Sequence, residues 1–292
     1  MISIIIVNYY QKKFIQRLLE SIKEVFSGME YEVIISNNSH EEEFSPDTNL
    51  KVIKADNRGF GAANNLAAKS AIGEYLFILN PDTILLKGDY NKAISMLDEG
   101  AGALGFQLLN EDKTFQISFG EDISFSGEIK NKKDEKLLRS HNTEILKELD
   151  NKYSKIKKVN WVSGAAIFIK KEVFEKVGGF DEGYFLYYED ADFCKRLRNL
   201  GYNIYYYPYI KVIHLKGENT KEDFHSSTYF YAKQSQMRYY RKHKNFLSRG
   251  FIRIYLICKF FVLYITKRNP VDKKILKMLL YFSSSSSESS SS

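Results

Sequence analysis

Near the N-terminus lies the sequence Ser3-Ile4-Ile5-Ile6-Val7-Asn8, in which four apolar residues are followed by a polar one. Apolar residues at consecutive positions are typical of a strand that is buried on both faces of a parallel sheet. A second run of this kind, Tyr75-Leu76-Phe77-Ile78-Leu79, is followed by Asn80-Pro81-Asp82. Because Pro81 cannot donate to a strand ladder, the chain turns there and presents Asp82 at the carboxyl end of the strand.

The segment between these two runs alternates between helical and extended patterns. Residues 31–36 and 51–54 are predicted strands, and the small residues from Asn57 to Asn65 lead into a helix. This alternation predicts an α/β fold with a Rossmann-like, mostly parallel central sheet and flanking helices. Ligands bind such sheets at the carboxyl ends of the strands, and a helix N-terminus suits phosphate. The pair Gly59 and Gly61 lacks the third glycine of a dinucleotide fingerprint, so it carries little information alone.

An aromatic run meets an acidic cluster at residues 179–192, in the sequence Gly-Phe-Asp-Glu-Gly-Tyr-Phe-Leu-Tyr-Tyr-Glu-Asp-Ala-Asp. From Phe193 onward, an apolar stripe with Leu197 and Leu200 predicts a helix. Asp190 lies on the same side as that stripe. A carboxylate there is costly unless it lines a polar cavity or has a partner, so we expect Asp190 to be a general base.

The neighbouring acids have a simpler interpretation as well. Glu189 and Asp192 share a face with Arg196, where they can form ion pairs, and acids in a first helical turn also complement the helix dipole. Trp161, the only tryptophan, opens a predicted strand that continues to Lys170. Its indole is expected to be either part of the core or a wall of the ligand cavity.

Six segments together resemble glycosyltransferase family 2, the inverting enzymes of the GT-A fold, and within it the bacterial rhamnosyltransferase-like branch. They occur in the family's order within roughly residues 1–215 and are Ile4–Tyr9, Asn57–Asn65, Asn80–Asp82, Trp161–Ala165, Gly179–Asp192 and Pro208–His214. The resemblance implies a GT-A domain over residues 1–221. A polar and highly charged insertion at residues 120–158 is expected on the acceptor side.

The resemblance also implies roles for individual residues. Asp82 and His214 would hold Mg²⁺ or Mn²⁺ against the diphosphate of a nucleotide-sugar donor, and Asp190 would be the catalytic base. The residues implied at the nucleotide sugar are Val7, Tyr9, Ser36, Asn57, Gly61, Asn64 and Asn80. Those implied in the pocket for the donor sugar or the acceptor are Trp161, Gly164 and Glu189.

One position departs from the family pattern. Relatives carry Asp-Asn after the second strand, and the Asp reads the pyrimidine, whereas this chain has Ser36-Asn37. A serine hydroxyl can hydrogen-bond a base edge, but it brings no charge and has a shorter reach. Base specificity therefore stays open between dTDP and UDP donors.

The C-terminal part differs in composition from the rest of a chain whose formal net charge is +7. Between residues 233 and 277 there are thirteen Lys or Arg residues and one acid, Asp272. The apolar run at residues 251–265 is interrupted by Arg253 and Lys259 and is shorter than a bilayer span.

We therefore expect residues 222–282 to form a basic, amphipathic helical segment on an anionic membrane surface. Packing on the domain or in a homodimer is the alternative. Nucleic acid is not expected as a partner, because no reader motif accompanies the basic residues. The Ser-rich stretch 283–292 is expected to be disordered.

Cysteine content and the N-terminus favour a cytoplasmic location. Cys194 and Cys258 lie far apart in apolar helical patterns, which predicts neither a metal site nor a disulfide. The opening apolar run is only one strand long and lacks a basic flank, so no signal peptide is predicted. We expect a cytoplasmic protein that is peripheral on the inner face of the cell membrane.

The predicted function is inverting transfer of a sugar from dTDP-rhamnose or a UDP-sugar to a hydroxyl of a glycan or lipid-linked acceptor, in cell-surface polysaccharide synthesis. A catalytically inactive GT-A scaffold or a nucleotide-sugar-binding protein is the alternative, although such a protein would need neither Asp82 nor Asp190. A sugar-phosphate nucleotidyltransferase should show a Gly-rich loop with a basic residue after the first strand. The chain instead reads Asn8-Tyr9-Tyr10-Gln11 there.

Overall fold

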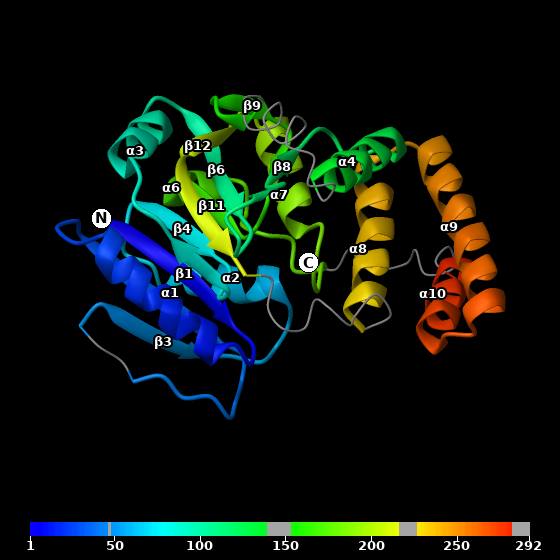
Figure 1. Ribbon diagram of the computed structural model, residues 1–292, viewed down its shortest axis with the longest axis horizontal. Coiled ribbons are helices and arrows are strands. Elements are labelled where there is room, and N and C mark those ends of the chain that lie inside the picture. Colours follow the sequence, from blue (N-terminus) through cyan, green and yellow to red (C-terminus); the bar gives the residue numbers. More distant parts are fainter. Residues whose placement is uncertain (46–47, 139–152, 216–226, 282–292) are drawn as a thin grey trace, which may run out of the picture. The chain divides into compact units, whose positions relative to one another are not determined.

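The computed structural model of the chain describes residues 1–45, 48–138, 153–215 and 227–281 (Figure 1). The chain divides into two compact units. The first comprises Met1–Gly183 and Glu189–Gly217, and the second comprises Tyr184–Tyr188 and Glu218–Ser292. The expected disorder of residues 283–292 concerns a stretch outside the described residues.

The first unit is built on a mostly parallel sheet, as the sequence predicts. Within the described residues its central order is β3 (Leu50–Lys54), β2 (Tyr31–Asn37), β1 (Ile2–Asn8), β4 (Tyr75–Leu79), β11 (Ala166–Lys170), β6 (Ala101–Leu109), β12 (Asn203–His214) and β5 (Thr83–Leu85). Strands β11 and β5 run antiparallel to their neighbours, and the other six run in one direction.

Short strands extend this arrangement at its edges. Strand β7 (Phe115–Gln116) pairs with β6, and β9 (Lys157–Val159) pairs with β12. A separate two-stranded sheet joins β8 (Phe119–Gly120) to β10 (Trp161–Val162).

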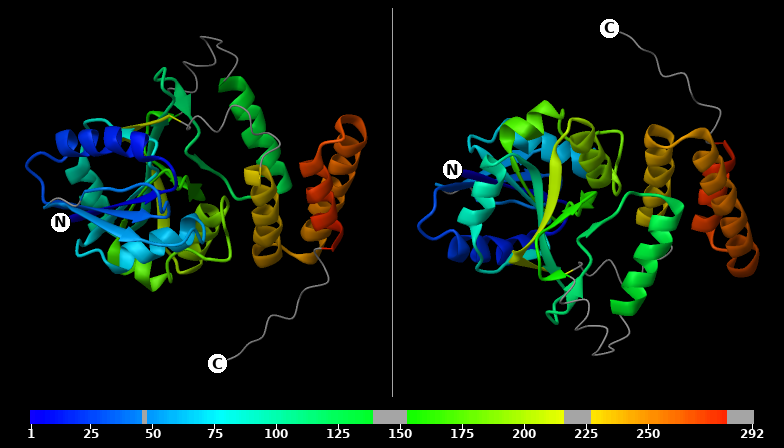
Figure 2. Two further views of the ribbon diagram at one scale, coloured as in Figure 1. Left: turned by 90° about the horizontal axis from the view of Figure 1, so that it is seen from below. Right: turned by 90° about the horizontal axis from the view of Figure 1, so that it is seen from above.

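Helices cover both faces of the large sheet, because its strands carry apolar side chains on both faces (Figure 2). On one face, α1 (Lys12–Val25) and α3 (Tyr90–Asp98) pack against alternate strand residues such as Ile4 and Ile6. On the other face, α2 (Phe60–Lys69), α6 (Lys171–Lys176) and α7 (Glu189–Asn199) pack against the intervening residues, including Ile5. The charged insertion contributes α4 (Phe125–Leu138).

Two sequence expectations about local structure are wrong. The strand predicted from Trp161 to Lys170 is broken at residues 163–165, because the chain turns there and the Ala166 N–H donates to the Ser163 carbonyl. Leu200 does not belong to the buried stripe of α7. The helix ends at Asn199, before Gly201 with its positive φ of 88°, and the Leu200 side chain is 51% exposed.

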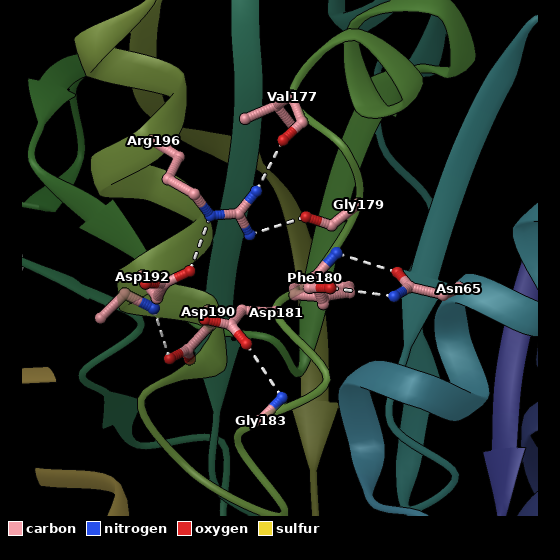
Figure 3. A network of polar contacts seen from close by, with 10 residues as sticks. Asn65, Val177, Gly179, Phe180, Asp181, Gly183, Asp190, Asp192 and Arg196 are labelled. Atoms are coloured by element: carbon pink, nitrogen blue, oxygen red, sulfur yellow. Dashed lines mark hydrogen bonds and ion pairs between the residues drawn. The ribbon is translucent and has the colours of Figure 1, made fainter. Parts of the chain in front are cut away.

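Arg196 on α7 fixes the loop that precedes the helix (Figure 3). Its Nε donates to Asp192 Oδ2 at 2.7 Å, and its two other nitrogens donate to the carbonyls of Val177 and Gly179 at 2.7 and 2.6 Å. Asp192 is fully buried, and the predicted Asp192–Arg196 ion pair is confirmed. The planar guanidinium thus holds one carboxylate and two carbonyls at once, which an ammonium group could not do in the same geometry.

Asn65 on α2 holds the next residue of the same loop. Its amide donates to the Phe180 carbonyl at 2.9 Å and accepts from the Phe180 N–H at 2.8 Å. Figure 3 shows the two amide contacts side by side. The loop backbone is therefore fixed by two helices before it reaches the acidic cluster.

The second unit is helical, as predicted. Helices α8 (Ser227–His243), α9 (Phe246–Lys267) and α10 (Pro270–Tyr281) pack on one another, and α9 buries Ile252, Leu256 and Phe260 at a spacing of four residues. The segment Tyr184–Tyr188 belongs to this unit.

Helix α8 holds that segment by several contacts. The Ser235 hydroxyl donates to the Leu186 carbonyl at 2.8 Å. The rings of Phe185 and Tyr231 lie 4.4 Å apart between centroids, and those of Tyr188 and Tyr239 lie 5.8 Å apart.

The substitution Arg196→Met tests the loop clamp. It removes the countercharge of a buried carboxylate together with two hydrogen bonds to carbonyls, so we expect the free energy of unfolding to fall by about 3–5 kcal/mol. Chemical denaturation measures this change. Arg58→Met is the matched control, because its ion pair with Glu182 joins an Arg side chain that is 73% exposed to a Glu side chain that is 39% exposed. There we expect a loss of about 1 kcal/mol or less. Equal losses in the two variants would contradict the clamp.

Candidate active site

The sheet brings the predicted site residues to one edge. Val7 pairs with Ser36, and the adjacent Ile6 pairs with Leu79, so β1, β2 and β4 end together just before Asn80. Strand β11 begins at this edge because Ala166 pairs with Leu79 in the antiparallel sense. The sheet therefore gathers residues distant in sequence at the position where open α/β sheets bind ligands.

Asp82 and His214 face each other at this edge. Asp82 Oδ1 lies 3.3 Å from His214 Nε2, and each side chain is 14% exposed. Antiparallel pairing of His214 with Thr83 fixes the two residues, as does the hydrogen bond from the Leu215 N–H to the Asp82 carbonyl. Two amides contact the imidazole: Asn80 Nδ2 lies 3.3 Å from Nε2, and Gln116 Nε2 lies 3.1 Å from Nδ1.

The chemistry of this donor set suits a divalent cation. A carboxylate oxygen and an imidazole nitrogen fit Mn²⁺, and the carboxylate fits Mg²⁺. Within the part of the chain that the structure describes, no group of three or more His, Cys, Asp or Glu side chains is placed to hold a metal ion. A cation at Asp82 and His214 would therefore take its remaining ligands from water or from phosphate, as Mg²⁺ commonly does in phosphate-binding sites.

Asp190 begins α7 with both carboxylate oxygens hydrogen-bonded. Oδ2 accepts from the Gly164 N–H at 3.0 Å and Oδ1 accepts from the Ala191 N–H at 2.7 Å. Burial raises the pKa of Asp190, and the backbone hydrogen bonds oppose that rise. The two backbone N–H groups therefore favour the charged form of a carboxyl group whose burial disfavours it.

Glu189 lies in a less favourable environment for charge. It is 5% exposed, and its Oε2 is buried with no hydrogen-bond partner among the described residues. Burial, and then the negative charges of Asp190 and Asp192, raises the pKa of Glu189 well above its ordinary value. Asp190 receives two backbone N–H groups whereas Glu189 Oε2 receives none, so Glu189 takes up a proton more readily than its neighbour.

The break in the strand at residues 163–165 connects the two acidic sites. Gly164 donates to Asp190, and the next residue, Ala165, accepts at its carbonyl from the Asn80 N–H at 3.0 Å. A Cβ at Gly164 would lie 3.3 Å from the Phe60 ring, so the absence of a side chain lets the backbone at residue 164 lie close to Phe60. The structure thus brings together Asp190, Gly164, Asn80, Asp82 and His214.

The predicted nucleotide-binding residues on and after β1 and β2 differ in how far they are exposed. Val7 is buried, and Ser36 is fully buried with its hydroxyl donating to Asn38 Oδ1 at 3.2 Å. Tyr9 follows β1 and is half exposed, with its ring edge-on to Tyr10. Ser36 therefore orients the amide of Asn38, for which the sequence predicts no role.

The residues assigned on and before α2 make contacts within the protein. Asn57 Oδ1 accepts from the Gly59 N–H at 3.2 Å. A Cβ at Gly61 would lie 3.0 Å from the Phe180 Cβ, so Gly61 allows close packing of the loop before α7. Asn64 is fully buried and donates to the Phe60 carbonyl at 2.9 Å. Trp161 lies on β10, and its Nε1 is buried without a partner among the described residues.

Local sequence patterns carry no signal for two residues of this region. Gln116 reaches His214 although 98 positions separate them, and it lies in a polar stretch without a motif. Asn65 belongs to a segment that was assigned to the nucleotide, yet its amide holds the Phe180 backbone. Both contacts depend on tertiary pairing, which local patterns do not encode.

Comparisons with known proteins identify the family and the fold of the chain. Residues 3–178 match the family model of glycosyl transferase family 2, and residues 148–219 match a model described as the N-terminal domain of galactosyltransferase. The chain is 27% identical over 275 residues to rhamnosyltransferase WbbL of Escherichia coli K12, a match that covers 87% of this chain and 98% of that protein. An N-acetylglucosaminyl-diphospho-decaprenol L-rhamnosyltransferase of Mycobacterium tuberculosis is 34% identical over 99 residues, which are 32% of each chain.

Two solved structures share the fold. The mannosyltransferase PcManGT of Pyrobaculum calidifontis, in complex with GDP-Man and Mn²⁺, has a TM-score of 0.53 at 17% identity and covers 99% of this chain and 76% of that one. GalNAc-T7 with UDP, GalNAc and Mn²⁺ has a TM-score of 0.56 at 15% identity and covers 83% of this chain and 51% of that one. The GT-A-type fold expected from the sequence is confirmed. The chain is a glycosyltransferase that belongs to glycosyl transferase family 2, in its rhamnosyltransferase-like branch.

Proposed function

We propose that the protein transfers a sugar, with inversion, from a nucleoside-diphosphate donor to a hydroxyl of a glycan or lipid-linked acceptor in cell-surface polysaccharide synthesis. The observation that carries the proposal is the series of contacts from Asp190 through Gly164, Ala165 and Asn80 to His214 and Asp82. The same chain of hydrogen-bonded residues thus holds a proton acceptor and a pair of cation ligands. A single displacement at the anomeric carbon requires both groups.

Asp190 would accept the proton of the acceptor hydroxyl while that oxygen attacks the anomeric carbon and the diphosphate leaves from the opposite face. The N–H groups of Gly164 and Ala191 orient its carboxylate. Glu189 beside it would be protonated, so the acceptor hydroxyl would approach one negative charge and not two. Asp82 and His214 would hold Mg²⁺ or Mn²⁺, which would neutralise charge on the departing diphosphate.

The names of the relatives support the choice of substrates. Both relatives named above are rhamnosyltransferases, and the mycobacterial name specifies a diphospho-decaprenol acceptor. For this chain we propose dTDP-rhamnose as the donor, with UDP-sugars next, and a lipid-linked acceptor. The two solved structures contain Mn²⁺ with a nucleotide or nucleotide sugar, which supports a divalent cofactor here.

The second unit offers a surface that fits a membrane. The face of α9 opposite its buried side is apolar at intervals of three and four residues, and the exposed fractions are 79% for Leu247, 56% for Phe251, 63% for Ile254, 53% for Phe261 and 57% for Ile265. No helix among the described residues is both long enough and apolar enough to cross a bilayer. An orientation of α9 in the plane of the lipid headgroups would bury this stripe.

The charge of this unit favours lipid over a second copy of the chain. Residues 227–281 contain thirteen Lys or Arg residues, and the one acid among them, Asp272, is fully buried. Two such surfaces would repel each other, whereas an anionic leaflet would attract each basic residue by about 1 kcal/mol. We therefore propose peripheral attachment to the inner face of the cell membrane, with α9 as the contact.

Asp82→Ala tests the cation site. In the wild-type protein, UDP or dTDP with Mn²⁺ at about 100 times the dissociation constant should stabilise the fold by about 2.7 kcal/mol. The variant should lose the part of this stabilisation that depends on Mn²⁺, measured as the shift in Tm. Asp98→Ala is the control, because Asp98 contacts Tyr75 at the opposite end of β4. An undiminished Mn²⁺-dependent shift in Asp82→Ala would exclude Asp82 as a ligand.

Asp190→Asn tests the base. The amide keeps the shape but cannot accept the proton, so transfer should fall by about 10²-fold or more while donor binding persists. Glu189→Gln should lose far less, because Glu189 is already neutral in our assignment. In the wild-type protein, transfer should decline as the pH falls through the raised pKa of Asp190, above the ordinary pKa of an Asp of about 3.9. A near wild-type rate in Asp190→Asn would move the base to another residue.

The double substitution Ile254→Asp and Phe261→Asp tests the membrane contact. It places two charges in the apolar stripe, so binding to vesicles of anionic phospholipid should fall more than about 10-fold, a change of about 1.4 kcal/mol. Ile72→Asp, at a side chain that is 76% exposed in the first unit, should bind like the wild type. If the double variant sediments with vesicles as well as the wild type does but loses a dimer that the wild type forms, the stripe joins two chains instead.

A further inference from the structure

Both ring nitrogens of His214 have an amide beside them. Gln116 Nε2 lies 3.1 Å from Nδ1, and Asn80 Nδ2 lies 3.3 Å from Nε2. A neutral imidazole has one N–H group and one acceptor nitrogen, so two amide N–H groups cannot both donate to it. At least one of the two amides must turn its oxygen toward the ring.

The position of Asp82 decides which nitrogen needs its lone pair. Asp82 Oδ1 lies 3.3 Å from Nε2, a separation that suits two ligand atoms each roughly 2.1 Å from one cation. Nδ1 faces Gln116 instead. If Nε2 is to bind a cation together with Asp82, the ring proton must be on Nδ1, and Nδ1–H needs an acceptor.

Gln116 can be that acceptor. Its Oε1 is buried and has no hydrogen-bond partner among the described residues. Rotation of the amide by about 180° exchanges its oxygen and nitrogen and brings Oε1 to Nδ1–H. Asn80 can then donate to the Nε2 lone pair whenever no cation is bound.

The sheet fixes this contact in place. Gln116 lies on β7 opposite Leu108 of β6, and β6 also pairs with β12, where Ile213 lies opposite Leu109. Gln116 and His214 therefore lie on two strands that flank the same central strand. Their separation is set by strand spacing and not by the conformation of a loop.

We propose that Gln116 is a positioning residue that accepts the Nδ1–H of His214 and so keeps Nε2 unprotonated for a divalent cation shared with Asp82. The proposal rests on the cation site of the proposed function. Histidines that bind metals generally donate their other N–H to a fixed acceptor, and removal of that acceptor weakens metal binding by about 10–100-fold.

The opposite arrangement has distinct consequences. If Gln116 donates to Nδ1, then Nε2 carries the proton and donates to Asp82 Oδ1. His214 would then be a hydrogen-bond donor at this edge, and Asp82 would hold a cation without it.

The test is the position of the ring proton in the metal-free, full-length protein. Imidazole nitrogens labelled with ¹⁵N distinguish the two neutral tautomers at a pH where histidine is uncharged. The chain has five histidines, and the signal that disappears in His214→Gln identifies His214. We expect Nδ1–H in the wild type and in Gln116→Glu, which retains an acceptor, and a shift toward Nε2–H in Gln116→Leu. Nε2–H in the wild type would overturn the role of Gln116.

Binding of Mn²⁺ in the presence of UDP or dTDP, followed by electron paramagnetic resonance, separates this inference from the proposed function. Gln116→Leu should weaken Mn²⁺ binding by about 10–100-fold, and Gln116→Glu should restore it. Gln16→Leu, at an exposed position on α1, should bind like the wild type. If Gln116→Leu fails to fold, Gln116→Glu still decides, because Nε2–H in that variant would contradict the proposal. Failure of the wild type to bind Mn²⁺ would overturn the cation site itself.

Discussion

The hydrogen bond from the Gly164 N–H to the Asp190 carboxylate is the interaction on which the rest of the site depends. It requires that the chain leave the sheet between β10 and β11, because an N–H in the strand ladder would be committed to a neighbouring strand. It is also favoured by a residue without a side chain beside Phe60, because a Cβ there would make a tight contact with the ring. Once both conditions are met, the carbonyl of the next residue holds Asn80, and the two acidic sites share one short piece of backbone.

The arrangement of charge follows from this frame. Glu189, Asp190 and Asp192 lie within four consecutive residues, yet each is treated differently by its surroundings. Asp192 pairs with Arg196, and Asp190 receives hydrogen bonds from two backbone N–H groups. Glu189 is buried, and its Oε2 has no hydrogen-bond partner among the described residues. Three carboxylates placed so close together would repel strongly if all were charged, so protonation of the least compensated one lowers the energy of the group.

The sequence predicts the scaffold better than the connections between its parts. Apolar runs such as Ile4–Val7 and Tyr75–Leu79 identify buried strands, because both faces of the sheet are covered and every position must be apolar. Asp82 is recognisable because it follows such a run. Asp190 is recognisable because it lies between an aromatic run and the apolar stripe of a helix. The sequence does not predict the break at residues 163–165, since the apolar residues on either side of it also fit one continuous strand. The contact of Gln116 with His214 is not predictable from local patterns, because only the pairing of β7 with β6 brings the two residues together.

The segment Tyr184–Tyr188 makes the C-terminal unit more than an addition at the end of the chain. Tyr187 and Tyr188 have positive φ angles of 68° and 67°, conformations that cost energy for residues with a side chain and persist where the surroundings enforce them. Their unit includes α8, while the residue that follows them begins the helix of Asp190. The two units are thus interleaved in the sequence, so a chimera joined only after residue 217 would separate five residues from the helix that holds them. Exchange of C-terminal units among relatives would have to carry the stretch before Glu189 along with it, which ties the divergence of the C-terminal unit to that of the acidic residues at the start of α7.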